Sequence, residues 1–323
     1  MYKRISLLLL LLLLLLPIVS CGSEKNEPQP AVVETTAEDI DKEETKDQET
    51  IKTDEDENKE EGESEQAGSD SNFTVPEEGV RPIAVMIDNE GTRSLPQGGL
   101  DKAQIIYEVI VEGGETRLMP VFWGTNPEMI GPVRSSRDYF LDYSMEHDAI
   151  YVHFGWSPKA KEDISKLKIN NINGLYVGTD VIWDLTKDKG NWQDSYTSME
   201  KLLAYATKVK YRLTTDRKFI FQYNQSDVVP EAGQTAVKIS LRYSSAYTSS
   251  YEYDSSTGLY NRFRKGKPHM ERVSGKQLTA KNIIIQYTPN YDIKGDNKGR
   301  QEMKTTGTGN GYYITGGKAI KIK

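Results

Sequence analysis

Polar side chains of several kinds are concentrated in residues 108–138, where carboxylates, arginines, serines and glycines follow one another closely. A Gly-Pro turn in this stretch leads into an Arg-Ser-Ser-Arg run at the start of a predicted helix, which one of the serines is expected to cap. The free N–H groups and dipole of a helix N-terminus favour an anion. Guanidinium groups bind carboxylate or phosphate through paired hydrogen bonds. We therefore predict an anion-binding site formed by Arg117, Arg134, Ser135, Ser136 and Arg137.

The protein's own acids are the alternative partners for these arginines. Asp138 and Asp142 follow the run, and Glu108, Glu112 and Glu115 precede it. Arginine is the residue most often used in internal ion pairs as well as in ligand recognition. The sequence leaves both interpretations open, because either a ligand or an internal carboxylate would satisfy the same guanidinium groups.

Two glutamates and one histidine are the catalytic candidates. Glu112 and Glu115 flank a Gly-Gly turn that can bring their carboxylates close together, and His153 ends a strand beside aromatic residues and a helix start. Glu108 and Glu112 would share a strand face, but about 13 Å apart. A glycosidase pair requires roughly 5 to 9.5 Å between its carboxyl groups. Glu112 or Glu115 acting with His153 is therefore the hypothesis for hydrolysis.

Other kinds of chemistry find little support in the sequence. His147 and His153 have no further clustered ligands nearby, so no metal site is predicted. No Gly-x-Ser-x-Gly elbow, phosphate-binding loop or dinucleotide fingerprint is present, so no cofactor is predicted. The single cysteine, Cys21, is assigned to lipidation below, which leaves no thiol for a disulfide or a nucleophile.

The N-terminal segment indicates the compartment. A basic Lys3-Arg4 pair precedes a leucine-rich stretch, residues 5–19, that is too short and too poorly flanked for a stable membrane span. Ile18-Val19-Ser20-Cys21 matches a lipobox, which predicts a lipoprotein signal peptide over residues 1–21 and acylation, including palmitate, at Cys21. Two acyl chains suffice for stable anchoring. We predict a protein anchored by Cys21 to membrane lipid, on the extracytoplasmic face of the cell membrane.

Charge is distributed unevenly along the chain. Residues 22–72 carry 19 acidic and 5 basic side chains and few apolar ones, which predicts a disordered acidic linker. Residues 73–323 carry 34 basic and 29 acidic side chains, so the folded part is mildly basic. Outside the membrane, such a surface favours an anionic cell-wall polymer or an envelope protein as partner, rather than nucleic acid.

Hydrophobic patterning predicts two domains of the α+β or α/β class behind the linker. Residues 73–230 alternate strands and helices, which predicts a mixed α/β domain, with its last strand at 219–223. Residues 231–323 lack a helical period and contain hairpin signals, which predicts a smaller β-rich domain. Helices are expected at 136–145, at 158–168 after a Ser157 cap, and after a capping box at 197–200 up to about residue 208.

Several motifs resemble those of a known family. They are RPIAVMIDN at 81–89, PQGGL at 96–100, YEVIVEGGETR at 107–117 and GPVRSSR at 131–137. The chain is identified by them as a member of the YerB-like lipoproteins, whose domain is described as one of unknown function. The family usually has Pro-His-Asn where this chain has Trp192-Gln193-Asp194, and it usually continues past the last hairpin. The resemblance therefore implies a truncated envelope lipoprotein with an α/β domain and a β-rich domain, and no established activity.

The functional expectation combines these observations. We expect a membrane-anchored, non-catalytic binding or assembly protein of the cell envelope, which recognises an anionic wall component or a protein partner. The alternative is a hydrolase acting on peptidoglycan or related wall glycans. A third reading, an assembly factor for another exported protein, predicts a stable protein partner.

Overall fold

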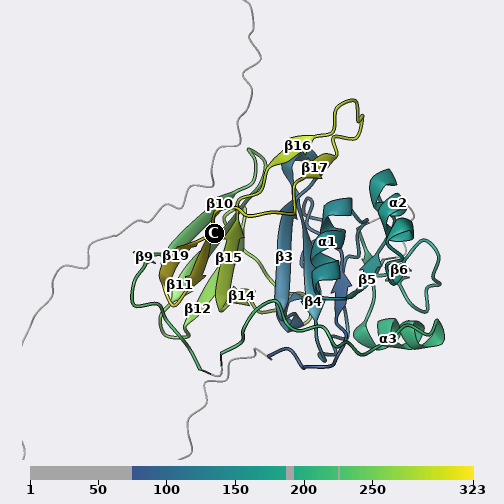
Figure 1. The fold of residues 1–323 in the computed structure, drawn as a ribbon, viewed down its shortest axis with the longest axis horizontal. Helices are drawn as coiled ribbons and strands as arrows, with labels where there is room; N and C mark the ends of the chain where they lie inside the picture. Colours follow the sequence, from purple (N-terminus) through teal and green to yellow (C-terminus); the bar gives the residue numbers. More distant parts are fainter. Residues whose placement is uncertain (1–74, 187–192, 225) are drawn as a thin grey trace, which may run out of the picture. The chain divides into compact units, whose positions relative to one another are not determined.

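The computed structural model describes residues 75–186, 193–224 and 226–323. In this part of the chain, a mixed α/β region is followed by a β-rich region with several sheets (Figure 1), which confirms the predicted fold class. The predicted signal peptide, Cys21 and the acidic linker at 22–72 lie outside the described residues.

Six strands form the N-terminal sheet, in the order β2-β4-β1-β5-β6, with β3 paired to β4. Neighbouring β1, β5 and β6 run parallel, whereas β3 and β4 form an antiparallel hairpin. Every residue of β1 and β5 is buried, as expected for parallel strands covered on both faces. The bounds are β1 (Ile83–Val85), β2 (Ile87–Asp88), β3 (Ile105–Ile110), β4 (Thr116–Phe122), β5 (Ile150–His153) and β6 (Asn171–Asn173).

Three α-helices cover the sheet: α1 (Asp138–Glu146), α2 (Pro158–Lys166) and α3 (Met199–Lys208). The sheet has one apolar cluster containing Met199 and Leu202 of α3, and a second containing Phe140 and Leu141 of α1. The predicted Ser157 cap of α2 is present, whereas the N-cap of α3 is Ser198, one residue after the Thr197 position implied by the capping box. The hydroxyl oxygens of Ser157 and Ser198 accept hydrogen bonds from backbone N–H groups of the first turns, at 3.1 and 3.3 Å.

The predicted serine cap of α1 is wrong. The N-cap residue of α1 is Arg137, whose side chain makes no capping bond. Ser136 lies before it in an extended segment that forms a parallel bridge with Trp156. The backbone N–H of Ser136 donates to Gly155 O at 3.0 Å, and its hydroxyl accepts from the Tyr151 hydroxyl at 2.9 Å. Ser136 is thus held by the strand β5 and its loop, and does not serve the helix.

The β-rich region consists mainly of two sheets. Strands β10, β11, β12, β13 and β14 form the first, and β15, β18, β19 and β9 form the second. Residues from both sheets, among them Ile239, Tyr260, Ile285 and Ile314, share one apolar cluster. Alternating burial along β12 and β15 is typical of sheets with one covered face. The bounds are β9 (Gln234–Thr235), β10 (Lys238–Arg242), β11 (Thr248–Asp254), β12 (Leu259–Arg264), β13 (Lys267–Pro268), β14 (Thr279–Ala280), β15 (Asn282–Gln286), β18 (Gly311–Thr315) and β19 (Lys318–Ile322).

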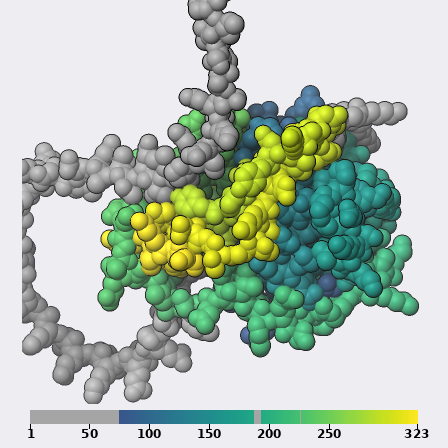
Figure 2. Space-filling model, turned by 45° about the horizontal axis from the view of Figure 1, so that its top comes forward, coloured from purple at the N-terminus to yellow at the C-terminus, as the bar shows by residue number. Residues whose placement is uncertain are grey.

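Two small hairpins complete the described fold, β7 (Trp183–Asp184) with β8 (Ser195–Tyr196), and β16 (Asn290–Asp292) with β17 (Gln301–Met303). The second hairpin lies in the β-rich region but contacts the N-terminal region, because Met303 packs against the apolar cluster formed by α1 and the N-terminal sheet. Figure 2 shows this yellow-green segment against the teal surface. The strand predicted at 219–223 does not form, and the Phe219 ring instead meets Trp123 edge-on.

Gly174, directly after β6, is fixed by packing. A Cβ atom at this position would lie 2.1 Å from Cδ2 of Phe154. We expect Gly174→Ala to lower the free energy of unfolding by about 1–3 kcal/mol, the usual effect of overpacking, as measured by urea denaturation. Gly178→Ala in the same loop is the matched control, since its Cβ would meet only the flexible end of the Asp180 side chain. Equal stability of the two variants would contradict this account.

Candidate functional site

The Arg-Ser-Ser-Arg run lies along the carboxyl ends of the central strands β1 and β5. The Arg134 N–H donates to Met86 O at 2.8 Å, directly after β1, and Arg134 O accepts from Phe154 N at 2.9 Å, directly after β5. Ligands of open α/β sheets bind at the carboxyl ends of their strands. The backbone therefore places the predicted anion-binding residues where this fold class forms its sites.

Arg117 and Arg137 share one carboxylate. Glu112 Oε1 accepts from Arg137 Nε at 2.5 Å, and its Oε2 lies 3.5 Å from Nη2 of Arg117. Nη1 of Arg117 donates to the carbonyl oxygen of Ser135 at 2.5 Å. Burial, together with the nearby charges of Arg137 and Arg134, lowers the pKa of Arg117 to about 10. Arg117 and Arg137 thus share one acid.

Arg134 is the most accessible of the three arginines, with 20% of its side chain exposed. Its Nε lies 3.3 Å from Oδ2 of Asp88, and its Nη2 lies 3.7 Å from the exposed carboxylate of Glu90. Gln193 donates to the same Asp88 oxygen at 2.9 Å. The structure therefore pairs all three arginines with the protein's own carboxylates.

The internal partners differ from those named in the sequence. Glu112 is among the acids named as alternative partners, but Asp88 and Glu90, in and after β2, were not named. Asp142, another of the named alternatives, instead accepts a hydrogen bond from the Thr305 hydroxyl. Ser135 and Ser136 lie in the same segment as Arg134 and Arg137, so the predicted set is brought together. Recognition of an external anion by it stays a prediction.

The catalytic candidates are separated from one another by their partners. Glu115 pairs with Lys265 at 2.5 Å and with Arg264 at 3.6 Å, whereas Glu112 faces Arg117 and Arg137. Both glutamates are therefore engaged with different cations, and their catalytic role stays a prediction.

His153 is fully buried at the end of β5. Its Nδ1 lies 2.7 Å from Gly155 O and its Nε2 lies 3.1 Å from Asn171 Oδ1. Burial lowers the pKa of His153. No group of three or more His, Cys, Asp or Glu side chains suited to a metal occurs within 75–186, 193–224 and 226–323.

Glu108 lies at the centre of a buried polar network that joins the two regions. Its carboxylate accepts hydrogen bonds from Tyr247 at 2.7 Å, Thr116 at 2.8 Å and Arg262 at 2.9 Å. Ser249 and Asn89 add longer ones, at 3.2 and 3.3 Å. Burial alone would raise the pKa of Glu108, but the Arg262 charge and these hydrogen bonds lower it overall. Glu108 is therefore ionised, and its hydrogen bonds connect the two regions.

The network continues from Arg262 through His269 to Gln97. Nε of Arg262 donates to Nδ1 of His269 at 2.9 Å, so Nε2 of His269 carries the proton and donates to Gln97 Oε1 at 2.7 Å. Burial and the charges of Arg262 and Arg264 lower the pKa of His269 well below its usual value. Sequence reasoning missed this network, because its hydrogen-bonded members lie up to 172 residues apart and share no local motif.

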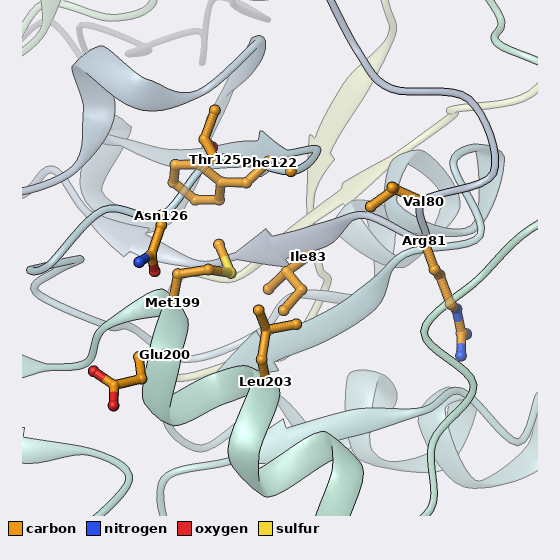
Figure 3. A pocket seen from close by; sticks show the side chains of 10 residues that line it. Val80, Arg81, Ile83, Phe122, Thr125, Asn126, Met199, Glu200 and Leu203 are labelled. Carbon is orange, nitrogen blue, oxygen red and sulfur yellow. The ribbon is translucent and has the colours of Figure 1, made fainter.

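A shallow apolar pocket lies elsewhere, at the beginning of β1 (Figure 3). The side chains of Ile83, Met199 and Leu203 point toward one another there, with Glu200 at the margin. None of the predicted site residues lines it. The pocket and the arginine cluster are therefore separate features.

Comparison with known proteins identifies the family. The model of the family described as "Protein of unknown function (DUF3048)" matches residues 72–212 with its N-terminal domain and residues 239–323 with its C-terminal domain. The chain belongs to the DUF3048 family. This confirms the resemblance recognised in the sequence motifs.

One relative, YerB from Bacillus subtilis, matches this chain both in sequence and in a crystal structure. The protein named "Putative lipoprotein YerB" from strain 168 is 32% identical over 244 residues, which cover 75% of this chain and 72% of that one. A crystal structure of YerB protein superimposes with a TM-score of 0.65 at 31% identity, covering 75% of this chain and 80% of that one. The family description itself assigns no activity.

The relative's name supports the lipoprotein assignment in its coarser form. Cys21 and the lipobox lie outside the described residues, so the lipidation site itself stays a prediction. No helix in the described part of the chain is both long and apolar enough to span a bilayer.

Proposed function

We propose that this chain is a lipid-anchored protein on the extracytoplasmic face of the cell membrane, which binds an anionic cell-wall polymer without turning it over. The observation that carries the proposal is the arginine cluster at the carboxyl ends of β1 and β5, with Arg134 accessible at its margin. Support for the anchor comes from the lipobox and from a lipoprotein relative.

The engagement of the candidate catalytic groups favours binding over hydrolysis. General acid–base chemistry requires a carboxyl or imidazole group within reach of the substrate. Glu112 and Glu115 are held by arginine and lysine side chains, and His153 is buried with both ring nitrogens facing acceptors. An anionic polymer would instead approach Arg134, whose partner Glu90 is half exposed.

Co-sedimentation with purified cell walls tests the proposal. The full-length lipidated protein, kept soluble in detergent, is mixed with walls that retain their anionic polymers. We expect it to pellet with them, and we expect Arg134→Ala to reduce the bound fraction at least fivefold. Arg242→Ala is the matched control, because Arg242 is an exposed strand arginine bonded only to the carbonyl oxygen of Ser244.

Two results would overturn the proposal. One is equal pelleting of the Arg134→Ala variant and wild type, with circular dichroism showing that both are folded. The other is release of soluble glycan fragments by the wild-type protein, abolished by Glu112→Gln or Glu115→Gln, which would establish the hydrolase instead.

A further inference from the structure

An aromatic ledge projects from the sheet next to the arginine cluster. It is formed by Trp156, after β5, and by Leu175 and Tyr176, after β6. The Trp156 ring lies 5.7 Å from the Tyr176 ring and 5.4 Å from the imidazole of His153, between centroids. Tyr176 is 71% exposed and Leu175 is 54% exposed. The rings thus run from the buried end of β5 to the surface.

The loops after β5 and β6, which form the ledge, are joined by hydrogen bonds. Oδ1 of Asn173 accepts from the backbone N–H of Gly155 and from that of Leu175, both at 3.0 Å. Gly155 has a φ of 76°, a left-handed conformation that favours glycine. Asn173 is buried, so this clamp lies beneath the exposed side chains. The ledge is therefore a preformed surface.

Polar groups border the ledge on two sides. Nζ of Lys161 lies 5.8 Å from the Trp156 ring centroid, and no ion pair joins Lys161 to an acid among the residues described here. On the other side, a Cβ atom built on Gly155 would lie 3.7 Å from both the Leu175 and the Ser135 side chains. Ser135 therefore connects the ledge to the arginine cluster.

We propose that Trp156, Leu175 and Tyr176 bind a sugar ring of an acidic wall glycan, with its carboxylate directed at Lys161. This inference rests on the proposed function and names the class of its ligand. Aromatic side chains offer an apolar face with a polar rim, which matches the C–H faces and hydroxyl groups of a pyranose. The unpaired ammonium group of Lys161 supplies the charge complementary to a carboxylate substituent.

The acidic linker favours a glycan over a lipid surface as the occupant. Aromatic and lysine side chains also occur at membrane interfaces. Residues 22–72, however, separate the folded part from Cys21 and carry a net charge of −14. Anionic headgroups would repel a segment of this charge, which favours an occupant of the ledge away from the bilayer surface.

Calorimetric titration of the full-length protein in detergent provides the test. The probes are a soluble peptidoglycan oligomer with lactyl carboxylates, an uncharged β-1,4-linked N-acetylglucosamine oligomer, and anionic phospholipid vesicles. We expect the peptidoglycan oligomer to bind, and Tyr176→Ala and Trp156→Ala to raise its Kd at least tenfold. Tyr291→Ala, which removes another exposed tyrosine (63% exposed), is the matched control and should leave Kd unchanged. Lys161→Met should weaken binding of the carboxylated oligomer only.

The outcomes separate this inference from the proposed function. If Tyr176→Ala binds the peptidoglycan oligomer with wild-type affinity, the proposed role of the ledge is wrong. The exposed Tyr176 side chain is not needed for folding, so this variant is a clean test. If the wild type binds vesicles but neither oligomer, and Tyr176→Ala loses the vesicle binding, the ligand of the ledge is a membrane surface and not a glycan. If the wild type and Tyr176→Ala pellet equally with walls but Arg134→Ala does not, the ledge is not a glycan-binding site and the proposed function stands. Failure of wild-type pelleting would remove the proposed function itself.

Discussion

Glu108→Leu is expected to lower the free energy of unfolding by about 3–5 kcal/mol, the usual effect of removing one partner of a buried ion pair. The substitution leaves Arg262 buried, with only 8% of its side chain exposed and no counter-charge. It also leaves the Tyr247 hydroxyl without its acceptor. Urea denaturation measures the change, and coincident transitions by tryptophan fluorescence, which reports the N-terminal region, and by circular dichroism would show that both regions unfold together.

Two further variants make this result specific. The double variant with Glu108→Leu and Arg262→Met should recover part of the loss, because replacing a buried ion pair by apolar side chains leaves no charge unpaired. Lys159→Met breaks the exposed Lys159–Asp163 pair and should cost about 0.5 kcal/mol or less. A Glu108→Leu variant as stable as the Lys159→Met variant would show that the network is not essential to the fold.

Glu112→Gln should have the second largest effect, a loss of about 1.5–3 kcal/mol at neutral pH, the range for hydrogen bonds to charged groups. The amide can still accept one hydrogen bond, but it leaves Arg117 and Arg137 close together without a negative charge. Glu302→Gln is the control, since Glu302 is exposed on β17 and has no such partners.

The effect of Glu112→Gln should depend on pH in a defined direction. Burial alone would raise the pKa of Glu112, but hydrogen bonding and the charges of Arg137 and Arg117 lower it overall. A carboxylate with a lowered pKa stabilises the folded state above the unfolded pKa of about 4.3. This contribution is lost as the pH falls through the folded-state pKa. Chemical denaturation from pH 7 to pH 3 should therefore show the variant and wild type converging at the acid end. A difference in unfolding free energy that stays constant with pH would mean that the charge of Glu112 does not contribute to stability.

Local patterns were sufficient to predict most of the fold. The apolar runs at β1 and β5, the Gly113-Gly114 turn and the serine cap of α2 all depend on residues close in sequence. The failed α1 cap shows the limit of such reasoning. Ser136 has the right residue type and position, but its backbone pairs with Trp156, which sequence spacing does not reveal.

The candidate site was predicted only in part, because its composition is local but its partners are not. The arginines and serines lie in one run, so they could be named from the sequence. Asp88 lies beside Arg134 because residues 86–88 pair with residues 132–134 through an antiparallel bridge between Ile87 and Val133, and Glu108 meets Arg262 from a separate region. Tyr176 gave no signal at all, since its exposure depends on how the loop after β6 is folded.

The distance along the chain between Glu108 and Arg262 also sets an order of events during synthesis. The two residues are 154 positions apart, and a chain is made from its N-terminus. Strand β3 therefore emerges from the ribosome before the partner of its carboxylate has been made. The face of the N-terminal sheet that carries Glu108 stays hydrated until β12 arrives. Completion of this buried network is thereby made conditional on synthesis of the chain as far as β12.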